Sequence, residues 1–241
     1  MKIKETSSYE NASGIFMRRA CCEMHHYCFH GRDAVTLIIS RDRSNPMDII
    51  QRGTTLIMEG RHLSDLDLFV CRVLDILTPC TPYVIVSGYV AILFGRTRST
   101  EDVDLLIPVC DGAAFRQIHD RFLGQGYEFL NAEDSSGLHA ILASGSGIRL
   151  CEKDAFIPNI ELKFISDEPD VYSFKNRIPL TIEGRTFWIG PLEMQIAYKF
   201  WLGSGKDIED AIYIREISRD FIDEDLLREF CSSFGVNDEP A

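Results

Sequence analysis

The stretch YVIVSGYVAILFGRTRSTEDVDLLIP, residues 83–108, decides the fold that we expect for this chain. Its apolar run 83–86 predicts a strand that is buried on both faces. Gly88 allows the backbone to turn sharply after this strand, and residues 89–94 predict a short buried helix that a glycine closes. A loop follows, and a second strand begins at Asp102.

The second strand carries two carboxylates, Asp102 and Asp104, separated by one residue. Alternate residues of a strand share a face, so both side chains should point the same way. Two carboxylates held together repel each other unless a cation lies between them. Hard oxygen ligands suit Mg²⁺, which proteins usually bind together with substrate phosphates. The helix that starts near Gly88 offers free backbone N–H groups to such a phosphate. A solvated acidic strand start is the alternative.

This order of residues resembles the nucleotidyltransferase superfamily, in which a small-residue turn after a strand precedes an Asp-x-Asp pair. Thirteen residues, 89–101, separate the turn from the pair here. Together with an Arg-x-Thr string, the stretch is most similar to AbiEii-type and related minimal nucleotidyltransferases, although its serine comes before the glycine of the turn. The resemblance implies phosphate or nucleotide binding by Ser87, Gly88, Arg98 and Thr100, and metal binding by Asp102 and Asp104.

The fold class that follows is α/β (α+β), a nucleotidyltransferase-like small mixed sheet flanked by helices, with C-terminal helices packed alongside. The predicted sheet runs from about residue 81 to 190. We expect a poorly defined N-terminal extension over 1–60, a catalytic core over 61–190 and a helical part over 191–236 that closes the nucleotide cleft.

Hydrophobic periodicity and turn residues predict the other elements. Ser64 should cap an amphipathic helix, and a helix over 111–124 should turn Phe115, Ile118, Phe122 and Leu123 inward. The glycine-rich turn 144–147 predicts a hairpin between 139–143 and 148–151, with His139 on the sheet surface. Further elements are predicted as strands 127–130 and 160–165, a hairpin of 178–182 with 185–189, and helices over 192–202, from Ser204 onward and over 224–234.

Glu161 and Lys163 should share one face of the strand 160–165. The superfamily often carries a third carboxylate on a strand beside the Asp-x-Asp strand, and Glu161 is the candidate. It would help to hold the metal or activate the attacking hydroxyl. The alternative is a surface pair of Glu161 with Lys163 across strands.

Lys199 interrupts an apolar helix, where a buried ammonium needs an anion, either a carboxylate or a nucleotide phosphate. AbiEii-like proteins carry a lysine at the matching place, which implies triphosphate binding; snorkelling to water is the alternative. The string Lys-Asp-x-x-Asp resembles the family's closing motif and adds Asp207 and Asp210 as nucleotide-site candidates. Ser204 and Asp207 also fit a capping pair.

Composition excludes several classes. The chain of 241 residues is 45% hydrophobic with a net charge of −12, which argues against a broad nucleic-acid surface. No run of about 18 apolar residues predicts a membrane span, and residues 1–40 lack a secretory signal. Eight scattered cysteines indicate reduced thiols and a cytoplasmic location.

The first 60 residues are the least informative. A Cys/His cluster over 21–30 contains zinc-ligand residue types, but its spacing matches no standard finger. The alternative is a poorly ordered leader, with the true start at Met47 or Met58.

The function predicted is Mg²⁺-dependent transfer of a nucleoside monophosphate from a nucleoside triphosphate to an acceptor hydroxyl, with Mn²⁺ as a substitute metal. The acceptor stays open between RNA, protein and a small molecule. The resemblance also implies a toxin–antitoxin component with a cognate antitoxin. The alternatives are a non-catalytic nucleotide-binding module of the same fold and an interaction protein built on the Cys/His cluster.

Overall fold

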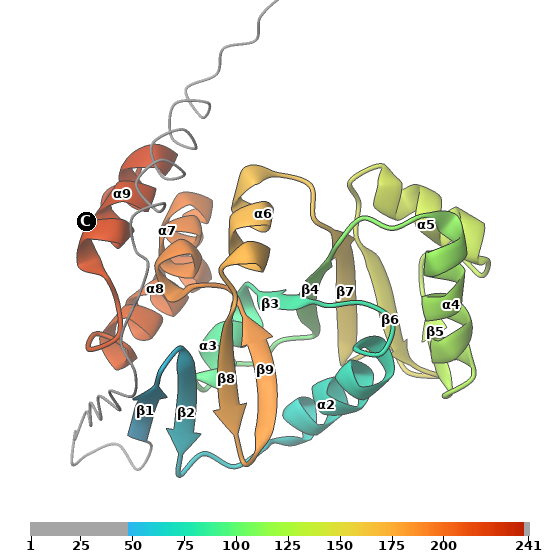
Figure 1. Ribbon diagram of the computed structural model, residues 1–241, viewed down its shortest axis with the longest axis horizontal. Helices are drawn as coiled ribbons and strands as arrows, with labels where there is room; N and C mark the ends of the chain where they lie inside the picture. Colours follow the sequence, from blue (N-terminus) through green and yellow to red (C-terminus); the bar gives the residue numbers. More distant parts are fainter. Residues whose placement is uncertain (1–47, 239–241) are drawn as a thin grey trace, which may run out of the picture. The chain divides into compact units, whose positions relative to one another are not determined.

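The computed structural model describes residues 48–238, and one mixed sheet of nine strands is formed between residues 48 and 189 (Figure 1). Its strand order is β1-β2-β8-β9-β3-β4-β7-β6-β5. The strands are β1 (Asp48–Arg52), β2 (Thr55–Glu59), β3 (Val84–Val86), β4 (Asp102–Ile107), β5 (Tyr127–Phe129), β6 (Ile148–Glu152), β7 (Asn159–Phe164), β8 (Ile178–Ile182) and β9 (Arg185–Ile189).

The Asp-x-Asp strand β4 lies in the middle of the sheet, between β3 and β7. It pairs with β3 in the antiparallel sense, with Val86 opposite Asp104. It pairs with β7 in the parallel sense, with Asp104 opposite Glu161 and Asp102 opposite Asn159. β3 and β7 therefore lie on opposite edges of β4, and the pairing with β7 brings a segment far away in the sequence beside the two carboxylates.

The sheet begins earlier than the predicted residue 81. Strands β1 and β2 form an antiparallel hairpin, and β2 adds to the sheet parallel to β8. Leu56 and Met58 alternate along β2 and are buried, as expected for a strand with one face on the core. Residues 48–59 therefore belong to the sheet, and the domain boundaries at 60 and 190 stay predictions.

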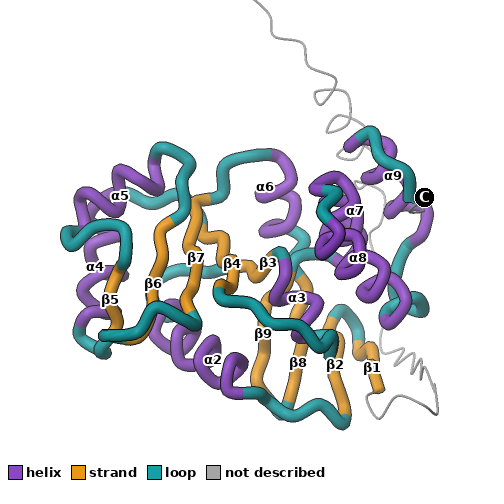
Figure 2. The backbone as a smooth tube through the Cα atoms, turned by 180° about the vertical axis from the view of Figure 1, so that it is seen from behind, coloured by secondary structure: helices purple, strands orange, loops and turns teal. Residues whose placement is uncertain are grey.

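Eight helices surround the sheet in the described residues, which confirms the predicted fold class. Figure 2 shows α7, α8 and α9 grouped together, and α7 packs against both of the others. The helices are α2 (Asp65–Leu77), α3 (Gly88–Leu93), α4 (Gly112–Leu123), α5 (Ser135–Ala143), α6 (Glu168–Lys175), α7 (Leu192–Leu202), α8 (Gly205–Ile217) and α9 (Glu224–Phe234).

Helix α2 begins as predicted. The Ser64 side chain accepts a hydrogen bond from the backbone N–H of Asp67, and Asp67 accepts one from the Ser64 backbone in return. Asp67 is also fully buried, where Arg61 pairs with it at 2.9 Å and the Tyr89 hydroxyl donates to it at 2.6 Å. These contacts tie the start of α2 to α3.

The predicted hairpin over 139–151 is wrong, because residues 135–143 form helix α5. Asp134 caps this helix by accepting from the backbone N–H groups of Ser136 and Gly137. Leu138 and Leu142, one helical turn apart, are both buried. The short run 139–143 satisfied the pattern of a buried strand and of a helix equally, and the upstream cap decides for the helix.

His139 consequently lies on a helix and not on the sheet surface, with its Nε2 2.9 Å from the carbonyl oxygen of Cys110. Leu123 also differs from expectation, since it is 46% exposed at the end of α4. Phe115, Ile118 and Phe122 form the buried stripe of α4, and Leu123 falls one position outside it.

Helix α6 was not predicted. Asp167 caps it by accepting from the backbone N–H of Asp170, and Pro169 lies in its first turn. Among residues 48–238, no helix combines the length and apolarity needed to cross a membrane. The five cysteines in this range are all free thiols, and the Cys/His cluster over 21–30 lies outside the described residues.

Candidate active site

Three carboxylates lie on one face of the central strands. Asp102 and Asp104 alternate with Val103, which is fully buried on the opposite face of β4. Glu161 stands directly opposite Asp104 in the β4–β7 register, so it shares their face. The structure therefore brings together the three residues that the sequence suggested as metal ligands.

Lys163 reaches between two of these carboxylates. Its Nζ lies 3.2 Å from Asp104 Oδ1 and 3.2 Å from Glu161 Oε1. The charges of Asp104 and Glu161 raise the pKa of Lys163 more than burial lowers it. Burial raises the pKa of Asp104, and the like charges of Glu161 and Asp102 add to that increase against the effect of Lys163.

Gly147 makes room for this pair of side chains. A Cβ at Gly147 would lie 2.5 Å from Glu161 Oε1 and 2.9 Å from Glu161 Cγ, so a larger residue would force the Glu161 side chain to move. The glycine-rich turn that suggested a hairpin therefore has another role. It lets the Glu161 and Lys163 side chains extend along the sheet face toward Asp104.

Thr100 and Asn159 flank Asp102. The Thr100 hydroxyl donates to the backbone oxygen of Asp102 at 2.9 Å and lies 3.2 Å from its Oδ1, which orients the carboxylate. Opposite Asp102 on β7, the Oδ1 atom of Asn159 is buried and has no hydrogen-bond partner in the described residues. An enclosed oxygen acceptor of this kind needs a donor or a cation.

The donor atoms are of the type that Mg²⁺ binds, but their arrangement does not form a Mg²⁺ site. Carboxylate and amide oxygens are its preferred protein ligands, and the buried Oδ1 without a partner belongs to Asn159, the residue that pairs with Asp102. Within residues 48–238, however, no three His, Cys, Asp or Glu side chains converge closely enough to hold a metal ion. The ammonium of Lys163 lies where a cation between Asp104 and Glu161 would have to sit.

The Ser87-Gly88 turn adjoins the carboxylates, because Val86 pairs with Asp104 immediately before it. Ser87 has φ 66° and ψ −143°, a backbone conformation that is nearly restricted to glycine. Its backbone N–H donates to Gln195 Oε1 on α7 at 2.9 Å. That contact removes one of the backbone donors that the sequence assigned to a phosphate and leaves the Ser87 hydroxyl.

Gly88 lets an arginine side chain pack closely over the backbone of the turn. The guanidinium of Arg98 packs over it, and a Cβ there would lie 2.8 Å from Arg98 Nη2. Arg98 in turn forms an ion pair with Asp210 on α8. Burial, followed by the charge of Arg96, lowers the pKa of Arg98.

Lys199 finds its anion within the protein. It is 1% exposed, and its Nζ lies 3.1 Å from Asp207 Oδ1 and 2.8 Å from Asp210 Oδ2. Burial lowers the pKa of Lys199. Arg96 completes this ion network through Asp210 and through Glu209 at 2.5 Å. Of the two anions that the sequence left open, Lys199 therefore contacts carboxylates.

Asp207 also serves as the predicted capping partner of α8. Its backbone N–H donates to Ser204 Oγ at 3.2 Å, and the Ser204 hydroxyl donates to its carboxylate at 2.5 Å. Partial burial would raise the pKa of Asp207, but Ser204 and Lys199 together lower it. Asp210, one turn later, is fully buried among three cations.

A cleft of about 340 Å³ opens between the carboxylate face and helices α6 and α7. Of the predicted site residues, it reaches Ser87 and Asp104. Asp102, Glu161, Arg98 and Lys199 do not line it. The residues with polar side chains that line it are Ser87, Asp104, Lys163, Ser166, Asp167, Asp170, Ser173, Gln195 and Tyr198.

The sequence did not predict a site role for Gln195 or Ser173, or that Lys163 bridges two carboxylates. The available signal for Gln195, which is 5% exposed, was a second polar residue after Glu193 in a mostly apolar helix. No sequence signal indicated Ser173, because helix α6 itself was not predicted. Lys163 was identified only as a neighbour of Glu161.

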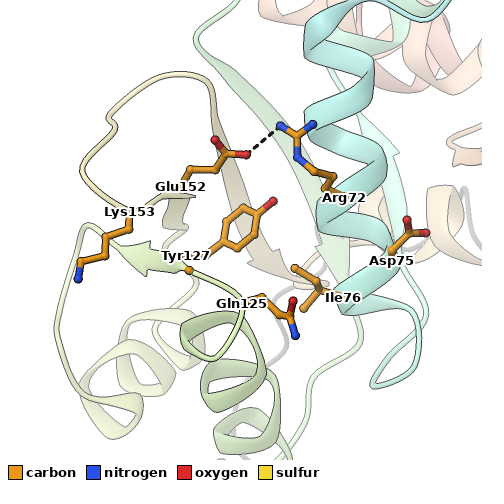
Figure 3. Close-up of a pocket in the computed structure, with 8 residues that line it drawn as sticks. Arg72, Asp75, Ile76, Gln125, Tyr127, Glu152 and Lys153 are labelled. Atoms are coloured by element: carbon orange, nitrogen blue, oxygen red, sulfur yellow. Dashed lines mark hydrogen bonds and ion pairs between the residues drawn. The ribbon is translucent and has the colours of Figure 1, made fainter.

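A larger hollow of about 500 Å³ lies elsewhere, between α2, β5 and β6 (Figure 3). Figure 3 shows Arg72 pointing toward Glu152, which it pairs with at 2.8 Å, while Lys153 points away. Both partners are about half exposed. None of the predicted site residues lines this hollow, so its size does not make it the candidate active site.

No protein-family model matches the chain, and no curated protein does. Among solved structures, it resembles the solution structure of antibiotic-resistance factor ANT(2″)-Ia with a TM-score of 0.43 and 15% identity, over 70% of this chain and 92% of that chain. It resembles the crystal structure of ANT(2″)-Ia in complex with adenylyl-2″-tobramycin with a TM-score of 0.44 and 15% identity, over 70% and 95%.

A third likeness is to an antigenic nucleotidyltransferase-like protein from Paracoccidioides brasiliensis, with a TM-score of 0.42 and 21% identity, over 61% of this chain and 72% of that chain. Because all three TM-scores lie below 0.5, activity and substrate must be inferred from this chain's own geometry.

Proposed function

We propose that this protein is a Mg²⁺-dependent nucleotidyltransferase. The observation that carries the proposal is the shared face of Asp102, Asp104 and Glu161 beside the Ser87-Gly88 turn, at the edge of a cleft large enough for a small ligand. Carboxylates on one sheet face next to a small-residue turn support the proposal, because phosphoryl transfer needs groups that position a metal ion and a polyphosphate together.

In the proposed reaction, the acceptor oxygen attacks the α-phosphorus of a nucleoside triphosphate while the bond to the leaving pyrophosphate breaks in line. Asp102 and Asp104 would hold Mg²⁺, which neutralises charge on the polyphosphate when bound. Glu161 helps to hold the metal or accepts the proton of the attacking hydroxyl. The Ser87 hydroxyl, at the cleft, donates to a phosphate oxygen.

In this proposal the ion network mainly holds the Ser87-Gly88 turn in place. Its members are Arg98, Lys199, Asp207 and Asp210. Arg98 covers Gly88 and is anchored on Asp210, which Lys199 also contacts. The positive charges of Arg98 and Lys199 would attract the polyphosphate from the far side of this ion network. Thr100 orients Asp102. Mn²⁺ would substitute for Mg²⁺ because it accepts the same oxygen ligands.

The narrower assignment rests on sequence strings. The Arg-x-Thr before Asp102 and the Lys-Asp-x-x-Asp that ends in Asp210 support an AbiEii-type enzyme, and with it a toxin–antitoxin role and a cognate antitoxin. The free thiols of the five described cysteines support a cytoplasmic location. RNA, protein and small molecules stay open as acceptors.

The Asp104→Asn variant tests the proposal. It removes one carboxylate charge from the proposed metal site, and incorporation of labelled nucleotide into a cell extract should fall at least a hundredfold. The matched control is Asp111→Asn, which makes the same change at the exposed cap of α4, away from the cleft, and keeps a good helix cap. Undiminished incorporation by Asp104→Asn, with the fold intact by circular dichroism, would refute the proposal.

A second candidate function is a nucleotide-binding module without transferase activity. Lys163 favours it, because an ammonium between Asp104 and Glu161 neutralises the charge that would attract a divalent ion. Such a module would bind nucleoside triphosphates in calorimetry, and the wild type would incorporate no label from any of the four triphosphates.

A further inference from the structure

We propose that Gln195 is a positioning residue for the transfer reaction. One end of its side-chain amide holds the Ser87 turn, and the other end contacts the nucleotide in the cleft between α6 and α7. This inference rests on the proposed function, in which the Ser87 hydroxyl donates to a phosphate oxygen. It adds the residue that connects a nucleotide in the cleft to that hydroxyl.

The backbone of Ser87 determines how the Gln195 amide is oriented. A backbone N–H can only donate, so the atom that it contacts at 2.9 Å must be the amide oxygen of Gln195. The bond joins helix α7 to the turn after β3, across 108 residues of chain. The oxygen end of the amide is therefore fixed on the turn, and the nitrogen end is directed elsewhere.

The Ser87 turn depends on a contact of this kind. Its φ of 66° and ψ of −143° lie in a region that residues with a Cβ rarely occupy, and such a conformation persists only when surrounding groups hold it. Ser87 lines the cleft, and its side chain makes no capping hydrogen bond to the start of α3. The direction of its hydroxyl therefore depends on the bond that Gln195 supplies.

The nitrogen end of the amide is available to a ligand. Gln195 Nε2 has no hydrogen-bond partner within residues 48–238. In that range the one fully enclosed side-chain atom without a partner is Asn159 Oδ1, so solvent reaches the Gln195 nitrogen although the residue is only 5% exposed. Gln195 lines the cleft, where a nearly buried donor can bind an acceptor atom of a ligand. Every nucleotide carries such atoms on its base, its sugar and its phosphates.

Gly190 leaves the space in which the amide lies. A Cβ at Gly190 would be only 2.5 Å from Gln195 Nε2 and 3.5 Å from Gln195 Cδ, so a side chain there would push the end of the amide aside. Gly190 does not have a positive φ, so its own backbone does not require a glycine. The glycine is explained by the position of the Gln195 amide.

Ser173 adds a second polar group from α6. It is 4% exposed, it lines the same cleft, and its hydroxyl makes no hydrogen bond in the part of the chain that the structure describes. Its Cβ lies 3.5 Å from the place where a Gly190 Cβ would be, which is also beside Gln195 Nε2. A ligand that accepts from the amide can therefore contact Ser173 as well.

These contacts link the nucleotide to the Ser87 hydroxyl through a single side chain. A nucleotide bound to Gln195 Nε2 restricts rotation of the amide, and the restricted amide keeps the Ser87 N–H, and with it the Ser87 hydroxyl, in one place. Loss of the link should misplace that hydroxyl relative to the polyphosphate. A misplacement on the order of 1 Å can slow a reaction by roughly a hundredfold.

The maximum rate of label incorporation into a cell extract, at saturating triphosphate, tests this role. Gln195→Met removes both ends of the amide at nearly constant side-chain size and should lower that rate about tenfold or more. Gln195→Glu keeps an oxygen for the Ser87 N–H and should recover most of the loss. Gly190→Ala keeps Gln195 but displaces its amide, so it should lower the rate as Gln195→Met does.

Binding is measured separately, by isothermal titration calorimetry on the full chain with Mg²⁺. The probe is the α,β-methylene analogue, which cannot be transferred, of the triphosphate that the wild type incorporates fastest. Gln195→Met and Ser173→Ala should each raise the Kd of this analogue by about threefold to tenfold, because each removes one hydrogen bond to it. The matched control is Gln125→Met, in the exposed hollow of Figure 3, which should change neither the rate nor the Kd.

A wild-type maximum rate in folded Gln195→Met and Gly190→Ala overturns the positioning role, and so does a Gln195→Glu variant as slow as Gln195→Met. An unchanged Kd in folded Gln195→Met and Ser173→Ala overturns the contact with the nucleotide. These results leave the proposed transfer reaction intact, since that is judged by Asp104→Asn. A wild type that incorporates no label overturns both.

Discussion

At Ser87 the backbone adopts φ 66° and ψ −143°, which a residue with a Cβ takes up at a cost of roughly 1–3 kcal/mol. The conformation is maintained from outside the turn, because Gln195 accepts the Ser87 N–H. Strain that distant residues impose is typical of functional turns, where it holds a group in one orientation. Here the group is the Ser87 hydroxyl at the cleft.

Ser87→Gly should therefore stabilise the protein. Relief of the strain outweighs the added entropy of a glycine in the unfolded chain, and we expect a net gain of about 1 kcal/mol in the free energy of unfolding. Urea denaturation at 25 °C measures it. Ser204→Gly is the control, because Ser204 has an ordinary φ of −69° and caps α8, so it should lose a few tenths. A loss at Ser87 as large as at Ser204 would contradict the strain argument.

At the scale of elements, the ion network joins three segments. Asp210 on α8 contacts Lys199 on α7 and both Arg96 and Arg98 in the loop before β4. Tyr213 adds a hydrogen bond from α8 to the carbonyl of Phe94 at the end of α3. Helix α8 therefore sets the position of the loop that leads into the Asp-x-Asp strand.

Removing the centre of this network should be costly. Asp210→Ala leaves three cations with fewer counter-charges in a buried place, and we expect a loss of about 3–5 kcal/mol in the free energy of unfolding. Chemical denaturation measures the change. Asp225→Ala, which removes an exposed partner of Arg228, should cost less than about 1 kcal/mol. Similar small losses of unfolding free energy in both variants would show that the ion network does not hold these segments together.

At the scale of the whole molecule, Mg²⁺ binding at the carboxylate face is coupled to the free energy of unfolding. A ligand that binds only the folded chain stabilises it by an amount that grows with its concentration relative to Kd. Lys163 already neutralises part of the charge of Asp104 and Glu161. Mg²⁺ without a nucleotide should accordingly change the stability of the wild type very little.

The Lys163→Met variant tests whether the Lys163 ammonium competes with Mg²⁺ for Asp104 and Glu161. Without the ammonium, Asp104 and Glu161 attract the cation, and Mg²⁺ at ten times Kd should add about 1.4 kcal/mol to the free energy of unfolding. Thermal unfolding with and without Mg²⁺ measures the effect. Lys153→Met, in the hollow of Figure 3, is the control and should behave like the wild type. An equal response of Lys163→Met and wild type would exclude displacement of Lys163 by the metal.

Local features of this protein could be predicted because they depend on neighbours in the chain. The capping residues Ser64 and Ser204, the glycine after β3 and the alternation of Asp102 with Val103 each follow from spacing within a few residues. The burial of Lys199 followed from the apolar residues around it on α7. Where the local signal was ambiguous, as over 139–143, a short apolar run was assigned to the wrong element.

The stretch 83–108 alone was enough to indicate a strand, a turn, a helix and a pair of carboxylates on one face, since each depends on contacts a few residues apart. The partners of that stretch come from the register of β7, which brings Glu161 and Lys163 to Asp104, and from α7, which brings Gln195 to Ser87. Those partners lie about 60 to 110 residues away in the chain. Periodicity says nothing over such distances, because strand order and helix packing are settled by burial of the whole core.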